Sequence, residues 1–259
     1  PKWNNFIDQT FMGDTTLITY IQRFFGQAII GETKEQLLPF FYGTGANGKT
    51  TMLNVIQNIL GIGQTGYSNT SPSEILTVSN RHPTEIAALS GIRLAVISEL
   101  EEGQRIAEAK AKELTGGDNI TARFMGKDFF TFTPTHTIVA LTNNMLETSG
   151  GGTAALWRRI RLIPFLYVVP KKDRNPHLEQ DLMEEAPGIL SWLIQGAIDY
   201  LSDGLREPAS VRAATADYEA DQNTVRQFLN EVCTRHETNQ DLHQVPVPHV
   251  RAAYERWCD

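Results

Sequence analysis

Cysteine, long apolar runs and positive charge are scarce in this sequence of 259 residues. Two cysteines, Cys233 and Cys258, are too few for a disulfide framework, which favours a reducing, cytoplasmic location. No apolar run approaches the roughly 20 residues that span a bilayer, and the N-terminus lacks a signal-peptide pattern, so we expect no membrane partner. Acidic residues outnumber basic ones by 30 to 23, a net charge of −7, which argues against a uniformly basic surface.

Apolar residues, by contrast, make up 41% of the chain, enough for one sizeable core. Their helical spacing over residues 1–36 predicts short N-terminal helices. Three short and almost wholly apolar runs, at 37–42, 94–98 and 137–141, are typical of strands buried on both faces. Because helical patterns separate these runs, we predict an α/β fold with a central, mainly parallel sheet.

Two further patterns complete the predicted organisation. Alternating residues from Ile120 to Phe132 predict a β-hairpin with Lys127 near its tip. The chain beyond Trp157 is interpreted as largely helical. We divide the sequence into an N-terminal helical segment (1–36), a core (37–170), a C-terminal helical segment (171–219) and a last module (220–259).

Polar residues follow directly after each of the three apolar runs, so the strand ends converge on one site. The first group fits G-x-x-x-x-G-K-[ST], the phosphate-binding P-loop, between a predicted strand and a predicted helix. Its glycines allow backbone N–H groups to surround phosphate oxygens, a lysine neutralises the phosphates, and a hydroxyl binds Mg²⁺. The residues of this loop are Gly43, Thr44, Gly45, Ala46, Asn47, Gly48, Lys49 and Thr50.

Glu99 and Asn143 stand at the ends of the second and third runs. A carboxylate there can hold Mg²⁺ or polarise an attacking water, and an amide can orient that water. Glu101 and Glu102 compete as a second acid, and Asn144 competes with Asn143. The alternatives are a solvated acidic turn for the glutamates and a turn-forming role for the asparagine.

Arginine is concentrated at Arg158, Arg159 and Arg161. One of these guanidinium groups could act on the γ-phosphate bound by a neighbouring subunit, whereas surface ion pairing is the alternative. The cysteines and histidines near the C-terminus match no common zinc-ligand spacing.

These motifs resemble superfamily 3 helicases, specifically the phage and plasmid primase-helicase family with viral relatives. The resemblance covers nearly the whole chain. It is carried by Gly43–Thr50, Gly91–Glu99, Leu114–Arg123, Phe132–Thr135, Thr142–Asn144, Trp157–Phe165, Glu185–Trp192 and Ala252–Cys258.

The resemblance implies an AAA+-like ATPase that binds ATP and Mg²⁺ between the subunits of a homo-oligomeric ring, usually a hexamer. Such a ring translocates on single-stranded DNA and unwinds forked duplex during replication, in the host cytoplasm if the gene is carried by a phage. A primase domain outside this sequence fits the family, since the chain starts at Pro1 rather than Met and reads as a fragment. From about Ala220 the chain resembles the start of a winged-helix module.

Site residues follow from the resemblance position by position. The P-loop corresponds to Walker A, with Thr50 as a Mg²⁺ ligand; Glu99 corresponds to the Walker B acid and second metal ligand. Asn143 corresponds to sensor 1. Arg159, with Arg158 next, corresponds to the arginine finger that acts in trans.

The hairpin corresponds to the element that grips DNA, with Arg123 and Lys127 on phosphates and Phe124 or Phe129 as support. Two positions depart from the family pattern: Ser98 precedes Glu99 where many relatives have a second acid, and Leu146 stands where proline is frequent.

The charge distribution agrees with DNA bound inside a ring. Residues 121–174 carry eight basic and three acidic side chains, a net +5, which leaves −12 for the rest of the chain. A replication initiator gated by ATP, without processive unwinding, is the alternative function. A P-loop kinase or metabolic ATPase needs neither the hairpin nor the arginines.

Overall fold

The computed structural model describes residues 1–63, 65–79, 83–101, 103–148, 151–234 and 245–258, with only the backbone at 99. The helices are α1 (Lys2–Thr10), α2 (Thr15–Ile30), α3 (Lys49–Leu60), α4 (Pro83–Ala87), α5 (Glu108–Thr115), α6 (Ala154–Trp157), α7 (Leu178–Met183), α8 (Ala186–Asp203), α9 (Ala209–Gln222), α10 (Thr224–Val232) and α11 (Val247–Cys258). The strands are β1 (Leu38–Tyr42), β2 (Ser68–Ser71), β3 (Leu94–Leu100), β4 (Arg105–Ile106), β5 (Ile120–Ala122), β6 (Phe130–Phe132), β7 (Thr137–Thr142), β8 (Glu147–Thr148) and β9 (Ile160–Pro164). Short 3₁₀ turns lie at Ser73–Ile75 and Lys171–Asp173.

Five strands form the central sheet in the order β2-β3-β7-β1-β9, and each neighbouring pair is parallel. The α/β fold with a mainly parallel sheet is therefore confirmed. The three apolar runs are its inner strands β1, β3 and β7, which need apolar side chains on both faces because helices cover both. All five strands point the same way, so their carboxyl ends lie along one edge of the sheet, called here the carboxyl edge, opposite the amino edge.

One face of the sheet is covered by α1, α2, α3, α7 and α8. The side chain of Asp14 caps α2 by accepting hydrogen bonds from the backbone N–H groups of Thr16 and Leu17 at 3.1 and 3.0 Å. Helix α2 then packs tightly on α8, because a Cβ on Gly26 would lie 2.1 Å from the backbone nitrogen of Ala197. The N-terminal helices and α8 thus share one hydrophobic core with the sheet.

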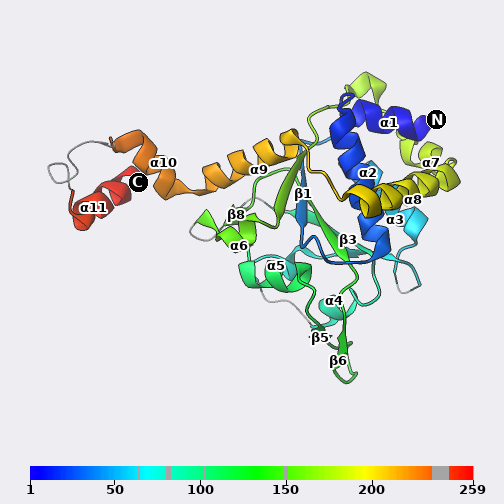
Figure 1. Ribbon diagram of the computed structural model, residues 1–259, viewed down its shortest axis with the longest axis horizontal. Helices are drawn as coiled ribbons and strands as arrows, with labels where there is room; N and C mark the ends of the chain where they lie inside the picture. Colours follow the sequence, from blue (N-terminus) through cyan, green and yellow to red (C-terminus); the bar gives the residue numbers. More distant parts are fainter. Residues whose placement is uncertain (64, 80–82, 102, 149–150, 235–244, 259) are drawn as a thin grey trace.

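The other face is covered by α4, α5, α6 and α9. Figure 1 shows α9 running away from the core toward α10 and α11, while the hairpin of β5 and β6 protrudes on another side. The hairpin was predicted, and its register pairs Ile120 with Phe132 and Ala122 with Phe130. Within the described residues of 220–259 we find only helices, so the winged-helix module stays a prediction.

The C-terminal part is largely helical, as expected, with one exception. The chain beyond Trp157 was interpreted as largely helical, but residues Ile160–Pro164 form β9, the strand beside β1. None of the helices in the described segments is long and apolar enough to cross a membrane.

Candidate active site

Residues Gly43–Thr50, the predicted P-loop and called the P-loop below, form a tight turn between β1 and α3 at the carboxyl edge. Gly45, Ala46 and Gly48 have φ values of +105°, +51° and +83°, so this stretch uses left-handed backbone conformations that glycine favours. Asn47 is buried, and its amide donates to the carbonyl of Phe165 at 3.2 Å. A Cβ on Gly43 would lie 2.6 Å from the backbone carbonyl oxygen of Phe165 and 2.1 Å from this amide nitrogen, so glycine is required there. The hydrogen bond between Asn47 and Phe165 therefore fixes the loop to the hydrophobic core.

Helix α3 begins at Lys49 directly after this turn, and no side chain caps it. Its first backbone N–H groups therefore lack an intrahelical acceptor and carry the positive end of the helix dipole. Such an uncapped helix start beside a turn of left-handed residues suits phosphate oxygens.

Lys49 is the buried cation of this site, with only 4% of its surface exposed. Its Nζ donates to the carbonyl oxygen of Gly43 and to Oδ1 of Asn143, the latter at 3.1 Å. Burial lowers the pKa of Lys49 to about 8, because neither acceptor is charged. A buried ammonium group with only neutral acceptors is stabilised when an anion binds beside it. The residues present therefore fit a bound phosphate group.

Asn143 reaches Lys49 because their strands meet at a topological switch point. After β1 the chain enters α3 on one face of the sheet, and the connection that follows β7 passes β8 and reaches α6 on the other. Ligands bind in the crevice that such divergent connections open. Asn144 instead takes part in a local turn, in which its backbone N–H donates to the hydroxyl of Thr142 at 3.1 Å.

Glu99 lies at the carboxyl end of β3, next to β7. The pairing of these strands shifts between Ile97 and Leu100, so that Leu100 stands opposite Thr142 with one extra residue on β3. Such a bulge changes the direction of side chains, and bulges occur often beside active sites. Ser98 and Glu99 form the irregular part of the strand. Glu101 and Thr50 are both exposed, whereas Glu102 lies outside the described residues.

Arg158 and Arg159 lie at the amino edge, opposite the P-loop. Ile160, the next residue, pairs with Leu38 at the start of β1, so the length of β1 separates the arginines from Gly43. At about 3.3 Å per residue, that separation is roughly 15 Å. An arginine at this place cannot serve the P-loop of its own chain.

The two arginines differ in burial. Arg158 is exposed and makes no side-chain hydrogen bond within the described part of the chain. Arg159 is buried, with 6% of its surface exposed, and each of its three side-chain nitrogens donates a hydrogen bond inside its own chain. Exposure therefore favours Arg158 over Arg159 for contact with another molecule, the reverse of the preference stated from the sequence.

The hairpin presents basic and aromatic side chains. The guanidinium carbon of Arg123 lies 4.7 Å from the ring centre of Phe129, and Phe124 stacks on Phe130 at 5.7 Å. Lys127 is exposed at the tip, as predicted. Since β6 leads to the amino end of β7, the hairpin root lies at the same edge as Arg158.

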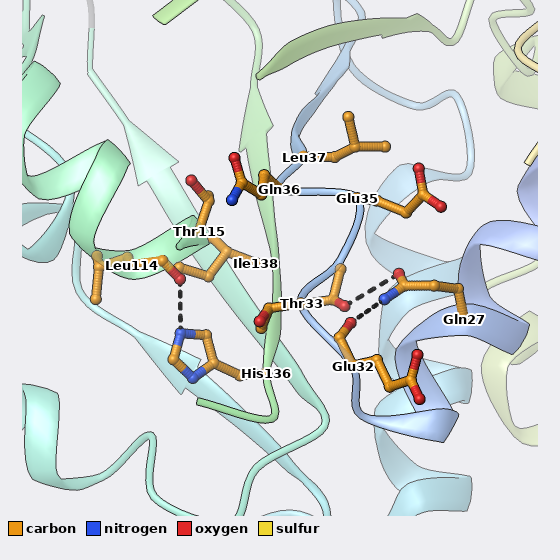
Figure 2. Close-up of a pocket in the computed structure, with 11 residues that line it drawn as sticks. Gln27, Glu32, Thr33, Glu35, Gln36, Leu37, Leu114, Thr115, His136 and Ile138 are labelled. Carbon is orange, nitrogen blue, oxygen red and sulfur yellow. Dashed lines mark hydrogen bonds between the residues drawn. The ribbon is translucent and has the colours of Figure 1, made fainter. Parts of the chain in front are cut away.

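Sequence reasoning missed His136, which Figure 2 shows beside a cavity of about 20 Å³ at the amino edge. Its Nε2 lies 2.9 Å from the carbonyl oxygen of Leu114, and burial lowers its pKa to about 4. A histidine that precedes an apolar strand has no signal in the sequence that distinguishes it from an exposed one.

This buried histidine predicts a pH-dependent stability. Because the folded-state pKa is below the ordinary value of 6.5, the unfolded chain binds more protons between pH 6.5 and 4. Above pH 6.5 the neutral His136 makes its full contribution to the free energy of unfolding. As the pH falls from 6.5 to 4, this contribution is lost, and the free energy of unfolding decreases by about 3 kcal/mol. Urea titrations at several pH values should show a shallower decline for His136→Gln than for the unsubstituted protein, and equal slopes would contradict the assignment.

Comparisons with known proteins agree with this architecture. Residues 41–159 match a protein family described as "Family of unknown function (DUF5906)". The chain is 27% identical over 241 residues to "Putative helicase L207/L206" of Acanthamoeba polyphaga mimivirus, which covers 86% of this chain and 25% of the relative. It is 23% identical to "Putative helicase 121R" of Invertebrate iridescent virus 3, and the match covers 98% of this chain and 29% of the relative. It is also 28% identical over 149 residues to "Putative primase C962R" of African swine fever virus (isolate Warthog/Namibia/Wart80/1980). This match covers 55% of this chain and 15% of the relative.

Among solved structures, the fold is similar to "The A form apo structure of NrS-1 C terminal region-CTR", with a TM-score of 0.63 and 12% identity. The similarity covers 88% of this chain and 52% of that one. Because the chain spans about a quarter of the length of the viral helicase relatives, it corresponds to one part of them. The comparisons show an α/β domain similar to parts of proteins named as helicases and primases in several DNA viruses.

Proposed function

We propose that this chain is the ATP-hydrolysing motor of a DNA helicase. The observation that carries the proposal is Lys49, a buried ammonium with neutral acceptors, held in a glycine-rich turn against Asn143 at the switch point of the sheet. That combination suits the phosphates of a nucleoside triphosphate. Thr50 and Glu99 are the proposed Mg²⁺ ligands, and the ion would supply charge neutralisation between the phosphates.

The positions of the site residues support a ring. The P-loop lies at the carboxyl edge of the sheet, whereas Arg158 lies at the amino edge. A complete site therefore needs the amino edge of a second copy against the carboxyl edge of the first. Repeated head-to-tail contacts form a closed ring when the rotation between neighbouring subunits divides a full turn evenly. We propose Arg158 as the residue supplied in trans, and a hexamer as the assembly that the family resemblance implies.

The hairpin supplies the proposed DNA contact. Arg123 and Lys127 are cations on a projecting element that also carries aromatic rings, and this combination suits single-stranded nucleic acid. The names of the viral relatives support a role in replication. A primase elsewhere in the full protein remains part of the proposal.

The proposal is tested by two measurements on the purified chain. ATP turnover should rise when single-stranded DNA is added, and a forked duplex should be separated in the presence of ATP and Mg²⁺. Turnover that does not respond to DNA would contradict a helicase motor. DNA-stimulated turnover without strand separation would favour the initiator alternative.

Replacement of Lys127 by alanine should weaken binding of single-stranded DNA. Loss of one phosphate contact is expected to reduce the slope of log affinity against log salt concentration by about 0.7. Fluorescence anisotropy of a labelled oligo(dT) strand over a salt series measures both quantities. Lys2→Ala, an exposed lysine on α1 outside the basic segment 121–174, is the matched control. An unchanged affinity and slope for Lys127→Ala would contradict the assignment of the hairpin tip.

A further inference from the structure

Arg159 joins three separate parts of the fold through its side chain. Its Nε donates to the hydroxyl of Thr115 at 3.1 Å, its Nη1 to the carbonyl of Ala155 at 2.6 Å, and its Nη2 to Oε1 of Gln36 at 3.2 Å. Its own carbonyl accepts from the backbone N–H of Leu38 at 2.7 Å. These contacts use the planar guanidinium group in directions that lysine cannot reproduce.

Each partner belongs to an element with a place in the proposed function. Thr115 ends α5 and precedes the hairpin strand β5 by a short loop. Gln36 stands just before β1, the strand that ends in the P-loop. Ala155 belongs to α6, the short helix that presents the exposed Arg158. The root of the hairpin, the start of the P-loop strand and the trans arginine therefore meet at one guanidinium group.

Two cavities border these contacts. Figure 2 shows Thr115 and Gln36 near each other among the residues that line the cavity of about 20 Å³, which is large enough for a single water molecule. Gln36 and Arg159 also line a larger pocket of about 500 Å³. Arg159 is buried although all its acceptors are neutral, and one hydrogen bond from each of its three side-chain nitrogens offsets part of the cost of burying the charge. Burial and the neighbouring charge of Arg158 also lower the pKa of its guanidinium group.

We infer that Arg159 is a positioning residue that couples the DNA-gripping hairpin to the nucleotide site. It holds the hairpin root, Arg158 and the amino end of β1 as one unit, so that a displacement of the hairpin by DNA reaches the P-loop strand and the arginine offered to the neighbouring subunit. The inference rests on the proposed function, because it requires a DNA-stimulated ATPase.

The test removes the partners of Arg159 one at a time and leaves the nucleotide and DNA residues intact. Thr115→Val deletes the acceptor for Nε together with the hydrogen bond that the same hydroxyl donates to the carbonyl of Ala111, and Thr115→Ser retains both as a matched control. Gln36→Asn shortens the side chain, and asparagine tolerates the left-handed conformation of this residue, whose φ is +52°. The readout is the ratio of ATP turnover with and without oligo(dT), together with the melting temperature.

We expect Thr115→Val and Gln36→Asn each to lower this ratio about fivefold, with turnover in the absence of DNA within about twofold of the unsubstituted protein. Thr115→Ser should retain the full ratio. The double variant should resemble Arg159→Lys rather than the sum of the single changes, because all of them interrupt the same connection. Should Thr115→Val fail to fold, Gln36→Asn carries the test.

Full stimulation in Thr115→Val and Gln36→Asn would overturn the inference while the proposed function stands. So would an equal loss of basal and stimulated turnover that follows a lower melting temperature, because that result describes a purely structural residue. If the unsubstituted protein shows no stimulation by DNA, the proposed function itself fails, and the inference fails with it.

Discussion

Replacement of Lys49 by methionine is expected to reduce ATP hydrolysis by about 10²–10³-fold, the effect of removing one preorganised donor from developing charge. Methionine keeps most of the buried stem and removes only the ammonium group, so the packing beneath the loop is preserved. Hydrolysis is measured by phosphate release at saturating ATP and Mg²⁺. Lys34→Met removes an exposed lysine that pairs with Glu32, and it should leave turnover unchanged.

The same substitution should not destabilise the protein in the absence of nucleotide. Lys49 is buried with neutral partners, and loss of its charge relieves a desolvation cost. The free energy of unfolding should therefore stay equal or rise by about 1–2 kcal/mol, allowing for the solvent that reaches the site. Added ATP should raise the melting temperature of the unsubstituted protein and not that of Lys49→Met. A large loss of stability would show that the lysine serves the fold rather than a ligand.

The inner strands of the sheet were predictable because burial on both faces imposes a continuous apolar run. Strands β1, β3 and β7 have this pattern, and each was predicted within two residues of its observed end. The two outer strands lack it. β2 reads Ser-Asn-Thr-Ser, and β9 contains Arg161 and Pro164. Edge strands have a neighbour on one side only and tolerate polar residues and proline, so local pattern does not reveal them.

In the candidate site, too, some features follow from local sequence pattern and others depend on tertiary packing. The spacing of the P-loop and the position of Asn143 after a buried strand were sufficient to predict that they meet at one edge of the sheet, and Nζ of Lys49 does reach Asn143. The burial of Arg159 could not be predicted, because its partners Thr115 and Gln36 lie 44 and 123 residues away in the chain. Adjacent arginines look alike in a sequence, and only tertiary packing decides which of them faces solvent.

Replacement of Arg158 by alanine is expected to lower ATP hydrolysis by about 10³-fold, the lower end of the effect of an arginine that stabilises charge on the transferred phosphoryl group. Affinity for ATP should stay within about threefold, because binding relies mainly on the P-loop of the same chain. Arg158→Lys should recover little activity, since an ammonium group lacks the forked donors of guanidinium. Single-turnover hydrolysis and binding of a fluorescent ATP analogue separate the two effects.

Mixing of inactive subunits then tests whether Arg158 acts in trans. In a mixture with Lys49→Met, some interfaces combine the intact P-loop of an Arg158→Ala subunit with the intact Arg158 of its neighbour. Random assembly at equal amounts produces such interfaces in about a quarter of positions, so turnover should recover toward that fraction. Two subunits disabled in the same part of the site cannot complement each other, which makes Lys49→Met mixed with Lys49→Ala the control. Because Arg158 and the P-loop occupy opposite edges of one sheet, an absence of recovery would mean that the two edges do not meet between copies.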